Sequence, residues 1–220
     1  MKAKFISYTK QSFSETETTT RSFEHLEYMQ KRRTVRDFSS KNIPEKIIEN
    51  IIMAASTAPS GAHKQPWTFC VVTNPELKSK IRLAAEKEEI DFYKNKISED
   101  WLEDLSYLGT DWNKPFLEIA PALIIVFKKS YDIIGDEKRA NYYVAESVGL
   151  ACGFLIEAIH YCGLVALTHT PSPMNFLIKL LDRPENEKPF LLIPIGYPAE
   201  NTLVPDLKRK EKKEVIQHFK

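Results

Sequence analysis

Apolar residues recur along this chain with two periods, one typical of helices and one typical of strands. Between residues 47 and 55 the isoleucines and alanines are spaced three and four apart, which places them on one helix face. Asn42 with Glu45 has the spacing of a capping box, and Pro44 suits a first helical turn. We therefore predict a helix from about residue 42 that ends before Pro59, because the residue before a proline is disfavoured in helical geometry.

Four short segments have the β-branched, aromatic and apolar content of buried strands. They are residues 67–73, 122–127, 164–168 and 190–196. Three further helices are predicted: a long polar helix that Asn74 caps, a mostly apolar helix at 139–161, and a short helix at 175–181. The small residues of the 139–161 segment, among them Gly149 and Gly153, would let another helix approach closely, as in a core or a dimer interface.

Two segments lack clear periodicity. Residues 9–22 are rich in Ser, Thr, Gln and Glu, and we expect an extended or partly disordered arm there. Residues 98–118 carry aromatic side chains without regular spacing, which is typical of an excursion or lid over a site. Helices and strands do not alternate as in a doubly wound sheet, and the sequence has no GxGxxG or Walker motif. The pattern therefore predicts an α+β domain with a mixed sheet.

Length and composition indicate one ordinary globular domain. The chain has 220 residues, of which 43% are hydrophobic and 28% are charged, within the range of folded soluble domains. Its 31 basic and 30 acidic residues leave a net charge of +1, so no global field attracts nucleic acid or an anionic membrane. Any anion site must therefore be local.

The cysteines and the start of the chain favour a reducing, cytoplasmic location. Cys70, Cys152 and Cys162 are odd in number and form no CxxC pair, so we expect neither a disulfide framework nor a zinc ribbon. The five histidines are too scattered to suggest a metal site, and we predict no metal. The first eight residues have the features of neither a secretory signal nor a membrane anchor, and no run of 18 apolar residues occurs.

Three segments contain residues suited to a ligand site. Residues 32–36 place three arginines and a threonine ahead of a predicted helix, and arginine is the preferred forked ligand for phosphate. A second basic cluster lies at 208–210. Each basic run alone is equally typical of a solvated surface. Residues 58–63 form a tight loop, in which Gly61 permits backbone geometry that other residues rarely adopt.

In combination, residues 32–36, 57–67 and 205–210 resemble the FMN-binding segments of nitroreductase-fold enzymes, and within that fold those of the iodotyrosine deiodinase family. The likeness is most specific in the run Ala-Pro-Ser-Gly-Ala-His at 58–63. It implies a mostly antiparallel sheet flanked by helices, in a domain-swapped homodimer. The implied domains are an N-terminal arm at 1–27, an FMN-binding domain at 28–210 with a lid near 88–118, and a C-terminal tail at 211–220.

The resemblance implies particular roles around FMN. Arg36 approaches the pyrimidine edge of the ring, where positive charge stabilises reduced, anionic flavin. Thr168, His169 and Thr170 are implied to contact the flavin, and a threonine hydroxyl there bonds to its N5. The vertebrate enzymes resemble Thr-Thr-Thr at this place, whereas the middle residue here is His169. We choose Thr170 as the hydroxyl, with Thr168 as the alternative. The residues implied at the phosphate and ribityl chain are Arg32, Arg33, Thr34 and Arg209, and those implied beside the ring from the partner subunit are Pro59, Ser60 and Gly61.

The same resemblance implies a halotyrosine site. Glu89 and Tyr93 are four residues apart, so a carboxylate and an aromatic ring lie on one helix face. By the resemblance, Glu89 binds the ligand ammonium, Lys114 binds its carboxylate and Tyr93 covers its ring. The backbone N–H of Ala62 binds the phenolate. Composition and periodicity alone would class these side chains as solvated surface.

The implied activity is FMN-dependent reductive dehalogenation of 3-iodotyrosine and other halotyrosines to tyrosine and halide. One alternative is a broad-specificity nitro or quinone reductase that uses NAD(P)H, for which the halotyrosine residues would be incidental. A relative that consumes its own flavin to make a corrinoid ligand is less favoured, because it needs no zwitterion site. The non-enzyme alternative is a flavin- or halotyrosine-binding module without turnover.

Overall fold

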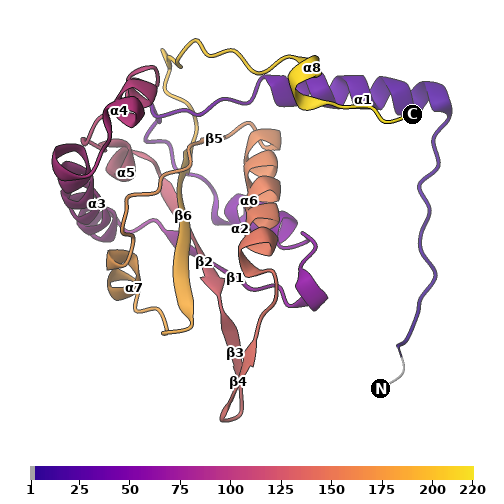
Figure 1. Ribbon diagram of the computed structural model, residues 1–220, viewed down its shortest axis with the longest axis horizontal. Coiled ribbons are helices and arrows are strands. Elements are labelled where there is room, and N and C mark those ends of the chain that lie inside the picture. The colour runs from indigo at the N-terminus through magenta and orange to yellow at the C-terminus, as the bar shows by residue number, and fades with distance from the viewer. Residues whose placement is uncertain (1–2) are drawn as a thin grey trace. The chain divides into compact units, whose positions relative to one another are not determined.

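The computed structural model describes residues 3–220 (Figure 1). These residues divide into two units, one that ends at Arg32 and one at 33–220. The first unit contains helix α1 (Glu15–Gln30), which begins at a capping box. The Glu17 N–H donates to Ser14 Oγ at 3.2 Å, and the Ser14 N–H donates to Glu17 Oε2 at 3.0 Å. The predicted disordered arm at 9–22 is therefore wrong from residue 15 onward, because this cap nucleates a helix although none of its residues is buried.

The second unit is built on a four-stranded sheet in the order β1-β2-β6-β5. All three pairings between these strands are antiparallel, and an isolated bridge between Thr34 and Ala166 adds a parallel contact. The prediction of a mixed, mostly antiparallel sheet is confirmed. The strands are β1 (Trp67–Val72), β2 (Ala122–Lys129), β5 (Val165–Ala166) and β6 (Glu187–Gly196).

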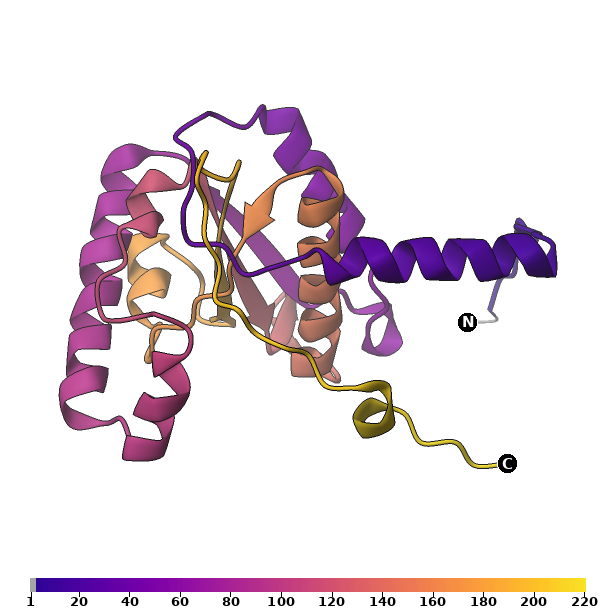
Figure 2. The same cartoon turned by 90° about the horizontal axis from the view of Figure 1, so that it is seen from above.

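Helices cover both faces of this sheet (Figures 1 and 2). Successive side chains of β2 point to opposite faces, so Ile124 packs in one apolar cluster and Ile125 in the other. The first cluster is completed by α2 (Glu45–Ala55) and α6 (Val144–Tyr161). The second is completed by α3 (Pro75–Asn95), α5 (Phe116–Ile119) and α7 (Phe176–Leu180). The result is three layers with a separate core on each side of the sheet.

Most predicted elements are present, with corrections at their ends. The Asn74 cap is confirmed, because the Leu77 N–H donates to its Oδ1 at 2.9 Å. The predicted capping box at Asn42 is wrong, since Pro44 is the N-cap of α2 and no side chain caps that helix. Helix α6 begins five residues later than the predicted start at residue 139. Residues 139 and 140 instead end the strand β4 (Glu137–Ala140), which forms a hairpin with β3 (Tyr131–Ile134).

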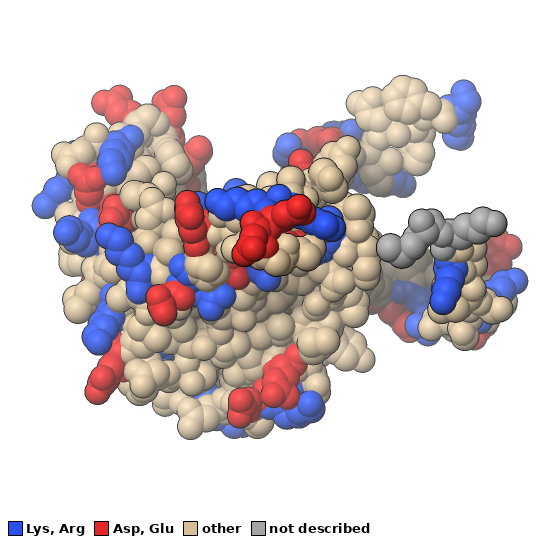
Figure 3. Space-filling model, turned by 90° about the horizontal axis from the view of Figure 1, so that it is seen from below, with Lys and Arg blue, Asp and Glu red and all other residues tan. Residues whose placement is uncertain are grey.

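The remaining elements lie at the ligand-site candidates and in the tail. They are the short helix η1 (Gly61–His63), α4 (Glu99–Ser106) and α8 (Lys212–Val215). The predicted irregular lid at 98–118 therefore contains a helix, α4, that Ser98 caps through the Trp101 N–H at 3.3 Å. On the face shown in Figure 3, basic and acidic side chains are interspersed.

Helix α6 combines a buried side with an exposed apolar side. Among residues 3–220 it is the one helix that is long and apolar enough to cross a membrane. Seven of its residues are buried, as expected of a core helix. Its outer side exposes Leu150 by 48% and Phe154 by 42%. Added Cβ atoms on the neighbouring Gly149 and Gly153 would meet open space, so a second helix could pack closely against this side.

Candidate functional site

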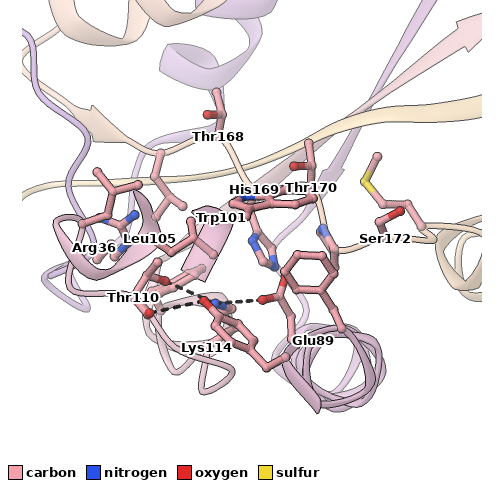
Figure 4. Close-up of a pocket in the computed structure, with 17 residues that line it drawn as sticks. Arg36, Glu89, Trp101, Leu105, Thr110, Lys114, Thr168, His169, Thr170 and Ser172 are labelled. Carbon is pink, nitrogen blue, oxygen red and sulfur yellow. Dashed lines mark hydrogen bonds and ion pairs between the residues drawn. The ribbon is translucent and has the colours of Figure 1, made fainter. Parts of the chain in front are cut away.

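A cavity of about 450 Å³ lies between α3, the 101–116 segment and the chain that follows β5 (Figure 4). This volume is within the range of small-molecule sites, about 300–1,000 Å³. Apolar side chains, such as Phe92 and Leu108, form much of the wall, and a few polar groups converge inside it. The predicted site residues that line it are Arg36, Glu89, Tyr93, Lys114, Thr168, His169 and Thr170.

Lys114 is the most buried charge in this cavity, with a side chain only 4% exposed. Its Nζ lies 3.1 Å from Glu89 Oε2 and 3.3 Å from Thr110 Oγ1, and it also donates to the carbonyl oxygen of Asp111. An ammonium has three N–H donors, so all three have acceptors. A buried ion requires this pairing, because desolvation of an uncompensated charge costs several kcal/mol.

Tyr93 and two further aromatic residues hold the lid segment against α3. The Tyr93 hydroxyl donates to the Thr110 carbonyl at 3.2 Å, and its ring centroid lies 5.8 Å from Lys114 Nζ. Burial raises the pKa of Tyr93, and the neighbouring Glu89 carboxylate raises it further. Phe92 packs edge-on against Trp101 with ring centroids 4.8 Å apart. The cavity is therefore closed on this side by α4 and by the chain before Lys114.

Arg36 supplies the second cationic group of the cavity. Burial lowers the pKa of its guanidinium, yet an arginine remains protonated at any physiological pH. It follows Thr34 and Val35, which are tied to β5 because the Val35 N–H donates to the Ala166 carbonyl at 3.2 Å. The strand end at residue 166 thus fixes where Arg36 enters the cavity.

His169 presents a neutral imidazole to the cavity. Burial, together with the positive charges of Lys114 and Arg36, lowers its pKa to about 3. Its ring packs edge-on against Phe116 at 5.6 Å, and its Nε2 has no partner within residues 3–220. The imidazole points toward the Glu89–Lys114 pair (Figure 4). In extended chain the side chains alternate, so the exposed threonines before and after His169 point the other way.

The loop at 58–65 does not line the cavity of its own chain. The Gly61 N–H donates to Ser147 Oγ of α6 at 3.2 Å, and a Cβ on Gly61 would lie 2.7 Å from the Tyr142 carbonyl oxygen. Gly61 is therefore required for close approach, whereas the expected unusual backbone geometry is found at the residues after it. Ala62, His63 and Gln65 have φ of 50°, 55° and 47°, a left-handed conformation that costs non-glycine residues about 1–3 kcal/mol each and is concentrated at functional sites.

The remaining predicted phosphate ligands lie outside the cavity. Arg33 Nη2 donates to the Pro205 carbonyl, and Thr34 forms a bridge with Ala166 of β5. Arg209 is exposed in the tail that follows Pro205. Arg32 belongs to the first unit, where its N–H donates to the Met29 carbonyl at 3.2 Å. The segment 33–36 therefore lies beside β5, and β5 is the strand that leads to Thr168.

Sequence reasoning missed two residues that hold Lys114. Thr110 accepts from its ammonium, and Glu86 Oε1 accepts from its backbone N–H at 2.8 Å. No sequence signal singles out Thr110. Glu86 could have been found from its spacing, because it lies three residues before Glu89 and shares its helix face.

Comparisons with known proteins agree with this geometry. Residues 29–197 match the model of the nitroreductase family. An iodotyrosine deiodinase of Haliscomenobacter hydrossis is 62% identical over 98% of this chain and 97% of its own length. Iodotyrosine deiodinase 1 of Mus musculus is 44% identical over 93% of this chain and 73% of its own. A crystal structure of oxidized iodotyrosine deiodinase bound to FMN and 3-iodo-L-tyrosine is similar with a TM-score of 0.74 at 30% identity, and covers 89% of this chain and 98% of that one.

The burial of neutral His169 predicts a particular acid sensitivity. Its pKa of about 3 lies below the value near 6.5 that it has in the unfolded chain. The unfolded state therefore binds a proton that the folded state does not, and stability is lost as the pH falls from about 6.5 toward 3. In that window the free energy of unfolding should decrease by about 1.4 kcal/mol for each pH unit because of this one group. Urea unfolding at several pH values gives the free energy of unfolding as a function of pH. Between about pH 6.5 and pH 3 this free energy should fall less steeply for His169→Gln than for the wild type.

The matched control for this measurement is His218→Gln, which removes an exposed imidazole and should keep the wild-type slope. The same dependence of unfolding free energy on pH in the wild type and in His169→Gln would contradict a neutral, buried His169.

Proposed function

The chain belongs to the iodotyrosine deiodinases of the nitroreductase family, and we propose that it catalyses the FMN-dependent reductive dehalogenation of halotyrosines. In this reaction 3-iodotyrosine, two electrons and one proton give tyrosine and iodide. The observation that carries the proposal is the Glu89–Lys114 ion pair, buried in the cavity at 3.1 Å. One carboxylate and one ammonium side by side are the complement of a free amino acid.

We propose that a zwitterion exchanges partners with this ion pair. Glu89 pairs with the ligand ammonium, and Lys114 pairs with the ligand carboxylate. The ligand adds one charge of each sign, so one buried ion pair is replaced by two and the cavity gains no net charge. Tyr93 lies on the same face of α3 as Glu89 and covers the ligand ring. The apolar wall at Phe92 and Leu108 excludes water from the bound ring.

The residues gathered beside β5 suit FMN. We propose that the phosphate and ribityl chain are bound by Arg33, Thr34 and Arg209, and that Arg36 meets the pyrimidine edge of the ring. FMN supplies the two electrons when it is bound, and the positive charge of Arg36 favours the reduced, anionic form. Thr170, exposed on the face opposite to His169, is the proposed hydrogen-bond donor to flavin N5, with Thr168 as the alternative.

We propose that a second copy of the chain completes the site, in a domain-swapped homodimer. The loop that carries Pro59, Ser60, Gly61 and Ala62 lies on the α6 side of the sheet and not at its own chain's cavity. The Ala62 N–H donates to no group within residues 3–220, and in the proposed dimer it binds the ligand phenolate. The exposed apolar side of α6 supports such an interface, because exposed apolar surface of this kind is typical of association sites.

The domain boundaries and the location follow from the same proposal. We propose that residues 28–210 form the FMN-binding domain, with the lid near 88–118, and that residues 1–27 and 211–220 are an arm and a tail. The enzyme acts in the cytoplasm on a small molecule, without a nucleic-acid or membrane partner. Within the family, a nicotinamide such as NAD(P)H is the class of electron donor that we expect.

Iodide release with paired binding measurements tests the activity. Anaerobically reduced, FMN-loaded protein should release iodide from 3-iodotyrosine. Glu89→Gln and Lys114→Ala should each weaken ligand binding by about 30-fold or more, because removal of one partner of a buried charge pair costs at least about 2 kcal/mol. Glu88→Gln removes the same charge one residue away, outside the cavity, and should bind like the wild type.

Unchanged binding in both Glu89→Gln and Lys114→Ala would overturn the proposed zwitterion site. Rapid turnover of nitroaromatic compounds without affinity for halotyrosine would instead support a broad-specificity reductase. Binding of 3-iodotyrosine without iodide release would support a binding module.

Light scattering tests the proposed dimer. The wild type should have twice the 25.4 kDa mass of one chain. Leu150→Asp combined with Phe154→Asp should give a monomer that loses FMN, because these charges would be buried on the apolar side of α6. Ile133→Asp in the β3–β4 hairpin, a residue 61% exposed, is the control and should stay dimeric. A monomeric wild type that retains FMN and releases iodide would refute the requirement for a second copy.

A further inference from the structure

Glu86 and Arg82 of α3 hold the main chain at Lys114. Neither residue is part of the proposed zwitterion site. Glu86 Oε1 accepts from the Lys114 N–H at 2.8 Å and from Arg82 Nε at 2.7 Å. The Glu86 side chain is only 12% exposed. A hydrogen bond to an ionised acceptor is stronger than one between neutral groups, so this carboxylate fixes the backbone position of the lysine.

Arg82 extends the same network to both sides of Lys114. Its Nη2 donates to Asn113 Oδ1 at 3.1 Å, and its Nη1 donates to Glu118 Oε2 at 2.9 Å. The hydrogen bond to Glu86 raises the pKa of Arg82, and the bond to Glu118 raises it further. One guanidinium therefore joins the residue before Lys114 to the short helix α5 that follows it.

Besides the Tyr93–Thr110 hydrogen bond and the contacts of the Lys114 side chain, the chain just before Lys114 has little apolar packing. Tyr107 is 64% exposed and Trp112 is 47% exposed, so this stretch has little apolar burial to hold it. Segments with few buried contacts open at low free-energy cost. The Arg82–Glu86 network is therefore the restraint that acts on the main chain of Lys114, in addition to the Glu89 contact that acts on its side chain.

Helix α3 carries Glu89 and also Glu86, which accepts from the main-chain N–H of Lys114. Glu86 and Glu89 are three residues apart on one helix face, and a helix rises about 1.5 Å per residue. The group that fixes Lys114 is therefore rigidly connected to the group that would bind the ligand ammonium. The separation between the two charged groups of the site is set by the backbone of α3.

Resting on the proposed function, we propose that Arg82 and Glu86 are positioning residues that set the Glu89–Lys114 spacing and so select α-amino acids. In an α-amino acid the ammonium and the carboxylate are attached to one carbon atom. An added carbon between them, as in a β-amino acid, increases their separation beyond what the fixed spacing accepts. Without the network, Lys114 is free to shift, which weakens binding of the α-amino acid and reduces discrimination against the β-amino acid.

Affinities of the FMN-loaded protein, read from flavin fluorescence, test this role. Glu86→Ala should weaken the binding of 3-iodotyrosine about tenfold, seen in both Kd and KM, a loss of about 1.4 kcal/mol, and leave kcat within about twofold. Glu86→Gln keeps an oxygen acceptor for the Lys114 N–H and should recover most of the affinity. The ratio of affinities for 3-iodotyrosine and its β-amino acid homologue, in which one CH₂ separates the amine-bearing carbon from the carboxylate, should fall in Glu86→Ala.

A double-mutant cycle separates positioning from a general loss of structure. In a Lys114→Ala background, Glu86→Ala should change the Kd by less than about twofold, because the side chain that it positions is gone. The same tenfold loss in that background, or a wild-type Kd in Glu86→Ala, would overturn the positioning role. If Glu86→Ala does not retain FMN, Asn113→Ala takes its place. Asn113 is exposed, and its replacement removes one acceptor of Arg82. Asn113→Ala should raise the Kd for 3-iodotyrosine about threefold.

The wild-type titration distinguishes this inference from the function on which it rests. Absence of 3-iodotyrosine binding by the wild type would contradict the proposed function itself. Wild-type binding with an unchanged Kd and an unchanged ratio in Glu86→Ala, or in its substitute Asn113→Ala, would contradict the positioning role alone.

Discussion

The buried ion pair between Lys114 and Glu89 is the interaction on which the site depends. Each ion compensates the charge of the other, because desolvation of an unpaired ion costs several kcal/mol. Lys114 meets that cost with three acceptors, from Glu89, Thr110 and Asp111. The pair keeps two opposite charges at a fixed separation in a largely apolar pocket, which is an arrangement that a zwitterion can take over without a net change in buried charge.

The sheet separates the two halves of the proposed chemistry. The cavity lies on the side of α3 and α5, whereas the strained loop at 58–65 is fixed to α6 on the other side. Both halves are rigid, since β2 has fully buried side chains in the core on each face. A site that needs both halves must therefore combine two copies of the chain. The exposed apolar side of α6 is the surface through which we propose that two copies associate.

Patterns that depend on local residues could be predicted, and those that depend on distant partners could not. The continuous apolar run of β2 and the Asn74 cap follow from neighbouring residues, and both are confirmed. The hairpin strand Glu137–Ala140 was not predicted, because all four of its residues are exposed and carry no apolar period. The close contact that requires Gly61 comes from Tyr142, far along the chain. Lys114 looked like solvated surface, since its burial depends on contacts with α3, and only the family resemblance indicated a role for it.

The exchange of the Glu89–Lys114 pair for a zwitterion is tested most directly by comparing two ligands that share a ring. Isothermal titration of the FMN-loaded wild type should measure the affinity for 3-iodotyrosine and for 2-iodophenol, which lacks both the ammonium and the carboxylate. The account predicts that 2-iodophenol binds at least about 100-fold more weakly, because both ion pairs to the ligand are absent from its complex and only the Glu89–Lys114 pair remains. Comparable affinities for the two ligands would contradict it.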